Sequence, residues 1–586
     1  MAKEEYRISD IYQGGPSSLS PKYGTVFDSY RINPSTFGLT TDPRTANVLQ
    51  DASSKLSAGI KHIEISAVTP QVFESIPRQQ LKELNRLSKL TGVDISLHGP
   101  IVEPSGMSEQ GFSESNRAAA ERQMINAIER GHDIKPDGII PVTFHSSAVG
   151  IPGGIPQKVG GKVKELEEGM IINTDTGSVH RVPLKERNFP GDEGKRNIQT
   201  EVNKINDEQW VENLRQMEYS SHVGGDAIER AMTTNIIAEE EKKAGKKRTK
   251  EEEMMHNEFN RGVTFLNSSY SGLKQLFEVA EKKCSDEEKK RIHDFYKEIM
   301  PKAEKIRDAP GTNESIMLMK DIINGGVEIL KDVHPKVYED LNNFAKKKSV
   351  ETFSNVALSS YKQFKDKAPI ISIENPPAGV IFSTGEELKD LVEKAREKFV
   401  EKAVREGVGK SEAKEAANRI LGVTWDVGHI NMLRKFGHEK EDIIKETEAI
   451  APLVKHIHLS DNFGLEHTEL PMGMGNVPMK EILDKLGKEG FNAKKIIEAS
   501  GWWEHFKSSP FQATLEAFGS PIYGMEMGPY WNQSMGLQQG YFSGYGSMLP
   551  QMNYETFGAG FSRLPAELGG QRGGAEGSRM SGRPME

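Results

Sequence analysis

Six short runs rich in β-branched residues each end on a residue that can bind a metal ion. These end residues are His98, His145, Glu374, Asp426, His458 and Glu498. Imidazole and carboxylate groups are the ligands from which proteins build sites for zinc, manganese or iron. Three further residues of the same types follow the last runs closely, namely His429, His467 and Glu469. The pattern predicts a metal centre, provided that the chain brings the ends of these runs together.

The runs have the character of β-strands that alternate with helices, an order typical of a parallel α/β barrel. Eight strands are predicted, with the sequences FGLTT, HIEISA, DISLH, GIIPVTFH, IISIE, GVTWD, VKHIH and KKIIE. Helices are expected between them at Ala46–Ala58, Gln71–Thr91, Ser113–Arg130, Gly385–Gly407, Lys440–Ile450 and Met479–Leu486. In a (β/α)8 TIM barrel the C-terminal ends of all strands form one face, so the ligand residues are expected to converge there.

More than two hundred residues separate His145 from Glu374, where a βα connection normally takes only a few. We interpret 151–366 as an inserted domain after strand 4, with a β-hairpin around the sequence TDTG and mainly helical structure beyond it. Residues 1–150 and 367–510 are then the two halves of the barrel. Because the insertion begins at the end of strand 4, it is expected to lie over the catalytic face as a lid or substrate selector.

The composition changes at residue 511 to Gly, Met, Tyr, Gln and Ser. Such a segment buries too little apolar surface to order alone, so 511–586 is predicted to be a low-complexity tail with a disordered end. Its tyrosines and methionines leave a second interpretation open, in which the tail packs against a partner protein. A charge-dense stretch in the insertion is interpreted as a solvated helix face rather than a binding tail.

The composition limits the chemistry and the location. The 586-residue chain has a net charge of −9 and one cysteine, Cys284. One cysteine excludes an intrachain disulfide and a thiolate zinc ribbon, so imidazoles and carboxylates must hold any metal. The mild acidity disfavours a strongly basic nucleic-acid-binding surface. No stretch approaches the roughly 18 apolar residues of a membrane span, and the charged start is unlike a signal peptide, so we expect a cytoplasmic protein without membrane contact.

Four other histidines need a separate interpretation, because an isolated histidine more often satisfies a local hydrogen bond than a metal. His62, His132 and His505 lack the strand-end setting and are interpreted as structural. His456 lies two residues before His458, so it points to the same inward face one layer deeper. A core role and a role supporting the metal ligands both remain open for it.

The segments around these residues resemble the endonuclease IV branch (AP endonuclease family 2) of the xylose-isomerase-like TIM barrels. The segments that carry the resemblance are DISLHGPIVEPSG, VTFHSS, SIENPPAG, VTWDVGH, HIHLSDN, ELPMGMGN and IIEASG. They span roughly Thr36–Gly150 and Ala368–Gly501, under half the chain. The insertion and the tail lie outside the resemblance.

The resemblance implies two or three divalent metal ions per chain, zinc in the first place and manganese or iron as alternatives. It puts one ion on His98 and His145. Glu374 bridges to a second ion, which is also held by Asp426, His458 and Glu498. The third ion takes His429, His467 and Glu469. At this last site the family has Asp-x-His, whereas this chain has His-x-Glu, with the same total of two imidazoles and one carboxylate.

The activity implied by the resemblance is phosphodiester hydrolysis, with Glu374 and Glu498 as the catalytic carboxylates and DNA with abasic sites as the substrate. Two departures from the family bear on the substrate. Ile101 and Val102 replace the bulky residues that probe the DNA stack, and Gly-Met-Gly stands where the family has Gly-Glu-Gly. A small phosphorylated or sugar substrate is therefore the alternative.

Two other functions remain open. A sugar isomerase or epimerase requires only the quartet Glu374, Asp426, His458 and Glu498. The Glu-x-Lys of aldose isomerases is absent, however, since Asn375 and two prolines follow Glu374. The third interpretation is a binding protein with structural metals, whose insertion or tail recruits a protein partner. The additional histidines favour the hydrolase, because a single-metal isomerase does not need them.

Overall fold

The computed structural model describes residues 37–56, 60–164, 166–184, 197–233, 250–499, 501–502, 506 and 509–517. These residues form two compact units. The barrel unit contains the described residues up to Pro104, then Ala118–Val163, and those from Ser349 onward. The insert unit contains Ser105–Arg117 and Lys164–Lys348. His505 and nearly all of the predicted tail 511–586 lie outside the described residues.

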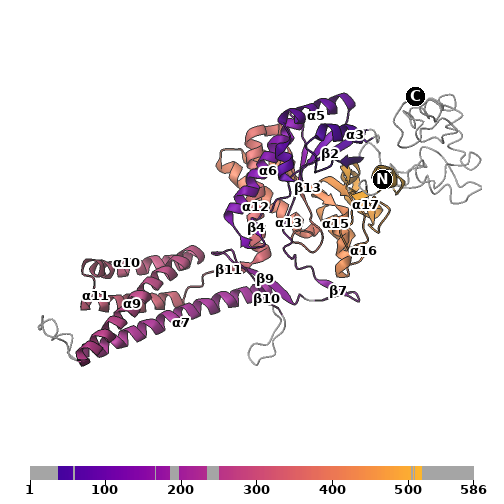
Figure 1. The fold of residues 1–586 in the computed structure, drawn as a ribbon. Coiled ribbons are helices and arrows are strands. Elements are labelled where there is room, and N and C mark those ends of the chain that lie inside the picture. The colour runs from indigo at the N-terminus through magenta and orange to yellow at the C-terminus, as the bar shows by residue number, and fades with distance from the viewer. Residues whose placement is uncertain are drawn as a thin grey trace, which may run out of the picture. The chain divides into compact units, whose positions relative to one another are not determined.

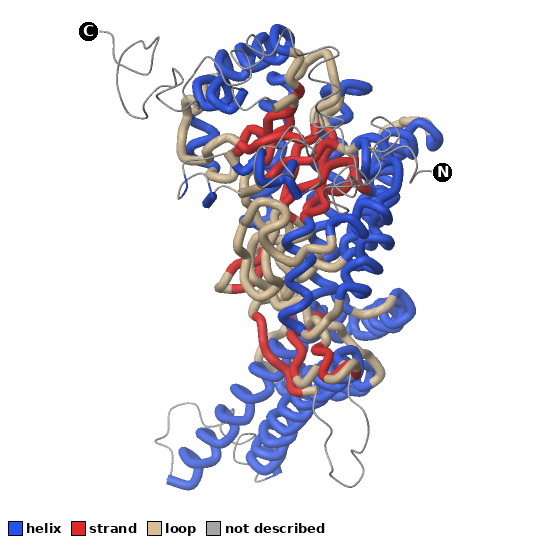
Figure 2. Tube along the Cα trace, turned by 90° about the vertical axis from the view of Figure 1, so that its right-hand side faces the viewer, coloured by secondary structure: helices blue, strands red, loops and turns tan. Residues whose placement is uncertain are grey.

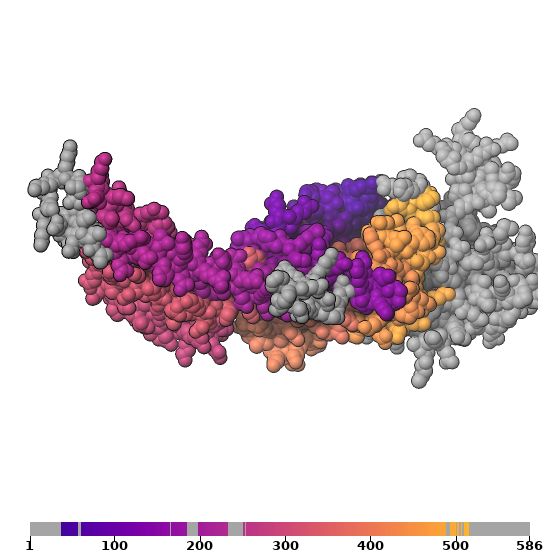
Figure 3. All heavy atoms as spheres, turned by 90° about the horizontal axis from the view of Figure 1, so that it is seen from below, coloured from indigo at the N-terminus to yellow at the C-terminus, as the bar shows by residue number. Residues whose placement is uncertain are grey.

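The barrel unit is a closed barrel of eight parallel strands, as the sequence predicts (Figure 1). The strands, in their order around the barrel, are β1 Phe37–Thr40, β2 His62–Ser66, β3 Asp94–His98, β6 Pro141–His145, β12 Ile370–Glu374, β13 Leu421–Asp426, β14 Val454–Leu459 and β15 Lys494–Ile497. Each predicted run forms one of them. Pairing of β1 with β15 closes the barrel, so the first and last strands are neighbours, and one face of the barrel unit carries both early residues (indigo) and late residues (orange to yellow) of the described chain (Figure 3).

The strands are buried on both faces, which explains why their sequences are nearly continuous apolar runs. All six residues of β13 are buried. The inward positions one layer below the strand ends are nevertheless polar. There the hydroxyl groups of Thr143, Thr424 and Ser372 bond one another, with oxygen–oxygen distances of 2.9 and 2.7 Å. Because these groups satisfy each other, a polar layer is tolerated beneath the strand ends.

Helices surround the strands of the barrel unit (Figure 2). They are α3 Val48–Leu56, α4 Pro70–Ser75, α5 Arg78–Thr91, α6 Glu114–Ile134, α13 Gly385–Arg405, α14 Lys410–Ile420, α15 Val427–Asn431, α16 Lys440–Ile450, α17 Met479–Asn492 and α19 Pro510–Ala517. Three short 3-10 turns cover Lys365–Lys367, Met432–Phe436 and Ala451–Leu453. The helix predicted over Gln71–Thr91 is two helices, because Pro77 disfavours helical geometry in the residue before it. Among the described helices, none is both long and apolar enough to cross a bilayer.

The helix that follows strand β6 in the barrel is α12 (Leu341–Phe364), which belongs to the barrel unit from Ser349 onward. Thr352 Oγ1 donates to the carbonyl of Pro104 at 2.8 Å, and Tyr361 donates to Glu412 at 2.5 Å. Phe353 is fully buried. The main segment of the insert unit, Lys164–Lys348, is thus shorter at both ends than the predicted insertion 151–366. Two adjacent parallel strands require a crossover connection, usually a helix. Here that helix is α12, which directly follows the long insert in the sequence and is therefore hard to distinguish from it.

The insert unit is mainly helical and contains the predicted hairpin. Strands β9 (Glu168–Asn173) and β10 (Val179–Pro183) pair antiparallel around TDTG, and β11 (Tyr338–Asp340) adds to β9. The helices are α7 Ile198–Thr233, α9 Lys250–Lys283, α10 Asp286–Asp308 and α11 Asn313–Lys331. The short pair of β4 Met107–Ser108 with β5 Gly111–Phe112 also belongs to this unit, whereas the pair of β7 Gln157–Val159 with β8 Lys162–Lys164 lies almost entirely in the barrel unit. The helices enclose their own core, in which Trp210 Nε1 donates to the carbonyl of Leu330 at 2.9 Å. The location of the insertion over the catalytic face stays a prediction.

The division into units predicts two different outcomes of deletion. Replacing 164–348 with a Gly/Ser linker should leave a barrel that unfolds cooperatively, because α12 keeps its barrel part. Replacing 153–366 should abolish folding, because it removes buried side chains such as Phe353, each worth about 3–5 kcal/mol. Circular dichroism melts of the two proteins test this. A cooperatively folded product of the longer deletion would contradict the assignment of α12 to the barrel.

Candidate metal centre

The predicted strand-end residues meet at one end of the barrel, with Glu374 in the middle. Strand register places Glu374 beside His145, and Asp426 beside His458. Glu374 Oε2 lies 3.3 Å from His98 Nε2 and 3.3 Å from His145 Nε2. Its other oxygen, Oε1, lies 2.7 Å from His458 Nδ1. Both oxygens of this one carboxylate therefore face imidazole nitrogens.

Four of the residues form a tighter group around His458. One ligand atom from each of Glu374, Asp426, His458 and Glu498 lies within 4.8 Å of the others. His458 Nδ1 is 3.2 Å from Glu498 Oε1. Glu374, Asp426 and His458 have no exposed side-chain surface, whereas the Glu498 side chain is 17% exposed. Three carboxyl groups thus share one small, nearly dry space.

The donor set of this space fits a divalent cation. Glu374 Oε2 and Asp426 Oδ2 are buried and accept no hydrogen bond. An unsatisfied buried carboxylate oxygen is costly, because it loses the hydration that it has in the unfolded chain. Carboxylate oxygens beside imidazole nitrogens are the ligand set that zinc, manganese and iron take in proteins. A cation at this position would satisfy both atoms.

The carboxyl groups differ in their affinity for protons. Burial, aided by the charge of Glu374, raises the pKa of Asp426 to about 6. Burial likewise raises the pKa of Glu498 to about 7. Burial alone would also raise the pKa of Glu374, but the imidazoles of His458 and His145 outweigh it and hold that pKa well below its usual value. In the absence of a cation, Glu498 takes up its proton near pH 7 and Asp426 near pH 6, which reduces the negative charge of the site.

The two imidazoles on Glu374 Oε2 are shifted in opposite directions. Burial lowers the pKa of His145 to about 3, which leaves its ring neutral. Burial also disfavours the charge on His98, but the adjacent carboxylate of Glu374 raises the pKa of His98 to about 9. Since only the neutral ring binds a metal, a cation would have to displace the second proton of His98.

Backbone carbonyls fix the orientation of two rings. His98 Nδ1 lies 3.0 Å from the carbonyl oxygen of Gly99, and His429 Nδ1 lies 2.7 Å from that of Asn375. A carbonyl only accepts, so Nδ1 carries the hydrogen in both rings. In His429, and in His98 once a cation has displaced its second proton, the Nε2 lone pair then points into the centre, as in metal-binding histidines whose other nitrogen donates to a carbonyl.

Asn375, which directly follows Glu374, ties the ends of β12 and β13 together. Its side-chain oxygen accepts from the Asp426 backbone N–H at 2.8 Å, and its side-chain amide donates to the Asp426 carbonyl at 3.0 Å. The Asp426 carboxylate in turn accepts from the backbone N–H of His429 at 2.7 Å. This chain of bonds sets the positions of Asp426 and His429 relative to Glu374.

The predicted third site is assembled in part. His429 Nε2 and His467 Nε2 lie 2.8 Å apart. Because His429 Nε2 presents a lone pair, His467 either donates a hydrogen to it or shares a cation with it. Within the described residues, groups of three or more close ligand residues comprise Glu64, His98, Glu374, Asp426, His456, His458 and Glu498. Glu469 is in none of these groups, and its role as a ligand stays a prediction.

The loop that carries His467 is held by Asp461. The Asp461 carboxylate accepts from the backbone N–H groups of Gly473 at 2.8 Å and Val477 at 3.1 Å. A Cβ atom on Gly475 would lie 2.3 Å from Asp461 Oδ1, so the Gly-Met-Gly turn requires glycine there. Asp461 therefore shapes the loop.

Sequence reasoning missed Glu64, a fully buried carboxylate on β2. Its Oε1 is 3.2 Å from His458 Nε2 and its Oε2 is 3.0 Å from His456 Nε2. Strand alternation was the available signal, because the sequence HIEIS turns His62 and Glu64 inward together. For His456 the sequence left open a core role and a role supporting the metal ligands. In the structure it contacts Glu64. His62 lies deeper, with Nε2 3.0 Å from Ser96 Oγ.

Part of the chain matches a known family. The family model described as xylose isomerase-like TIM barrel matches residues 403–514. This segment, which contains β13, β14 and β15, is similar to that family. The matched segment contains Asp426, His429, His458 and Glu498, whereas His98, His145 and Glu374 lie outside it. The endonuclease IV branch of the superfamily stays a prediction.

Similarity to individual proteins is more distant. Uncharacterized protein MJ1311 of Methanocaldococcus jannaschii is 27% identical over 191 residues, which are 31% of this chain and 56% of that protein. The chain thus spans about half the length of this relative. A D-tagatose 3-epimerase-like protein is 13% identical with a TM-score of 0.37, covering 82% of this chain and 96% of that one. The 3-keto-D-glucoside 4-epimerase YcjR from E. coli is 9% identical with a TM-score of 0.33, covering 82% and 97%. At these TM-scores neither structure informs the function.

The raised pKa values predict that a cation stabilises the protein more at pH 8 than at pH 5.5. Without a cation, the stabilisation from protonated Asp426 and Glu498 is full below about pH 4 and is lost as pH rises through about 6 and 7. A cation must displace these protons, so its affinity falls by about tenfold per proton and pH unit below those values. Melting temperatures with and without Mn²⁺ measure the effect. An equal increase at both pH values would contradict it, and Asp426→Asn should flatten the dependence.

The third site predicts the outcome of a substitution in the loop. Glu469→Ala should remove about one metal equivalent per chain and leave the others, since His429 and His467 alone hold a cation weakly. Glu466→Ala, an exposed carboxylate in the same loop, is the matched control and should leave the metal content unchanged. Elemental analysis of the proteins purified without chelator reports the metal content. Equal metal content in wild type and Glu469→Ala would exclude Glu469 as a ligand.

Proposed function

We propose that this protein is a metal-dependent phosphodiester hydrolase with a multinuclear centre. The observation that supports this most is the two-sided setting of Glu374. Two imidazole nitrogens lie 3.3 Å from its Oε2, and a third lies 2.7 Å from its Oε1. A carboxylate with ligand groups at both oxygens is suited to bridge two cations, which an isomerase using a single metal does not require.

The ligand residues divide into two sets around this bridge. His98 and His145 would hold one cation with Glu374 Oε2, whereas Asp426, His458 and Glu498 would hold another with Oε1. His429 and His467 would hold a third cation. Grouped divalent cations lower the pKa of a bound water and neutralise the charge that develops on a phosphoryl group.

Glu498 is the carboxyl group best suited to move a proton. It retains 17% exposure of its side chain, whereas Glu374 and Asp426 have none. Glu498 would accept the proton of an attacking water at a carboxylate oxygen, while Glu374 stays ionised and holds the ligand sets together.

For the substrate, we propose DNA that contains an abasic site. The support is the resemblance of the strand-end segments to endonuclease IV, together with exposed apolar side chains on the loop that follows strand β14. There Phe463 and Leu465 are 60% and 58% exposed. Apolar side chains of this kind can pack against bases where the duplex is interrupted. A small phosphorylated compound is the alternative substrate.

A sugar isomerase or epimerase is the second candidate. It is favoured by the compact quartet of Glu374, Asp426, His458 and Glu498, whose ligand atoms lie within 4.8 Å of one another. Such an enzyme needs one cation and a pair of carboxyl groups that exchange protons with the sugar. The metal count separates the candidates, because the hydrolase requires two or three equivalents and the isomerase requires one.

The proposed hydrolase predicts strand scission 5′ to a single abasic site in duplex DNA by the metal-loaded protein. Glu374→Gln should lower the rate on the order of a thousandfold with the fold intact, because the bridging ligand loses its charge but not its volume. The control is Glu448→Gln, an exposed carboxylate on α16 that should leave the rate unchanged. Gel analysis of the end-labelled duplex measures scission. Ketose–aldose exchange without scission would overturn the proposal in favour of the isomerase.

A further inference from the structure

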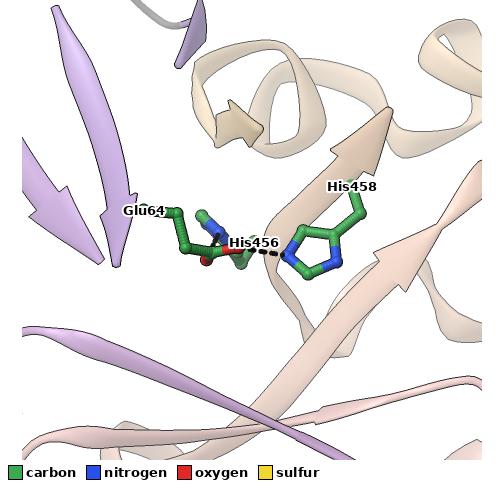
Figure 4. Close-up of side chains that lie close together, drawn as sticks. All are labelled: Glu64, His456 and His458. Carbon is green, nitrogen blue, oxygen red and sulfur yellow. Dashed lines mark hydrogen bonds and ion pairs between the residues drawn. The ribbon is translucent and has the colours of Figure 1, made fainter. Parts of the chain in front are cut away.

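A buried polar cluster lies one layer below the metal centre, and its middle is Glu64. Glu64 comes from β2, whereas His456 and His458 come from β14 (Figure 4). The Glu64 carboxylate and both rings have no exposed side-chain surface. The cluster lies outside the ligand sets described above, except that it shares His458 with them.

The hydrogens around Glu64 can be assigned from its neighbours. Ser96 Oγ donates to Glu64 Oε2 at 2.9 Å, and His456 Nε2 lies 3.0 Å from the same oxygen. Having given its only hydrogen to Glu64, the Ser96 hydroxyl accepts one from His62 Nε2 at 3.0 Å. A buried ionised carboxylate is stable only among such donors. Glu64 therefore needs hydrogen-bearing nitrogens on both rings that face it.

This requirement decides which nitrogen of His458 carries a hydrogen. His458 Nε2 faces Glu64 Oε1 at 3.2 Å as an ion-pair contact, and among the described residues neither atom has a hydrogen-bond partner. The opposite nitrogen, Nδ1, lies 2.7 Å from Glu374 Oε1 and 3.2 Å from Glu498 Oε1. A carboxylate only accepts, so Nδ1 donates to Glu374 in the cation-free protein. A cation would displace that hydrogen, and with the other hydrogen kept on Nε2 the Nδ1 lone pair would face the space between these carboxylates.

His458 differs in this respect from the other oriented rings. His98 and His429 donate from Nδ1 to a neighbouring carbonyl and present Nε2 to the centre. His458 presents Nδ1, so its acceptor must lie on the far side of the ring, deeper in the barrel. A carboxylate there attracts the hydrogen-bearing nitrogen more strongly than a carbonyl does, because it carries a full negative charge.

We propose that Glu64 is a positioning residue that fixes His458 with Nδ1 as its metal-binding nitrogen. Ser96 and His456 hold the carboxylate in place through its other oxygen. The inference rests on the metal centre of the proposed function, but it holds equally for a hydrolase and for an isomerase. An additional cation bound between Glu64, His456 and His458 is less favourable than this positioning role, because His458 would then have to bind metal through both nitrogens.

The test is titration calorimetry of Mn²⁺ and Zn²⁺ into the full-length chain and into Glu64→Gln. We expect Glu64→Gln to bind about 10- to 100-fold more weakly with unchanged stoichiometry, the usual effect of removing a carboxylate that orients a ligand. Ser96→Ala is the matched control. It removes a donor from Glu64 Oε2 but keeps the charge and the contact with His458, so its loss of affinity should be much smaller.

A second measurement covers the case that Glu64→Gln does not fold. Nitrogen NMR of ring-labelled histidine in the zinc-loaded wild type, with His458→Gln to assign the signals, should show Nδ1 bound to metal and Nε2 protonated. Metal on Nε2 would overturn the proposal. Unchanged affinity in Glu64→Gln would also overturn it and leave the proposed function intact. Loss of one equivalent would overturn it in favour of a cation beneath the centre, and a wild type that binds no ion would overturn both.

Discussion

The fully buried carboxylate of Glu374 is the constraint around which the barrel end is built. A charge without solvent access is stable only when opposite charges, donors or a cation surround it. Three imidazole nitrogens from β3, β6 and β14 lie within 3.3 Å of its oxygens. The barrel meets this requirement because parallel strands in register end at one level, so side chains from distant parts of the chain reach the same point.

The layer beneath has a supporting role that follows from the same alternation. Two residues before five of the six strand-end ligands, the strands place the polar residues Ser96, Thr143, Ser372, Thr424 and His456 on the inward face. Serine and threonine hydroxyls satisfy one another and leave the ligands above free of competing donors. Glu64 lies in the same layer, and its carboxylate contacts the ligand His458 above it and helps to orient that ring. The centre is thus two layers deep, with charge in both.

Several features of the fold and the site are predictable from particular residues. The runs that end at His98, Glu374 and Asp426 identify strands because a continuous β-branched run fits a strand buried on both faces. The hairpin follows from alternation around TDTG. The barrel part of α12 was assigned to the insertion, because length and helical character do not reveal against which unit a helix packs. Glu64 was missed because the role of an inward-facing Glu depends on the residues that face it across the barrel, which the sequence does not identify.

Residue order alone is enough for the eight strands and for the imidazole and carboxylate chemistry at their ends, since periodicity and side-chain type are local properties. Folding decides the rest, because it depends on atoms far apart in the chain. Glu64 and His458 are almost four hundred residues apart, yet their contact selects which nitrogen of the ring faces the centre. The pairing of His429 with His467 likewise depends on how Asp461 folds its loop. Proton positions and ligand geometry are consequences of burial and of contacts across the barrel, which no local pattern contains.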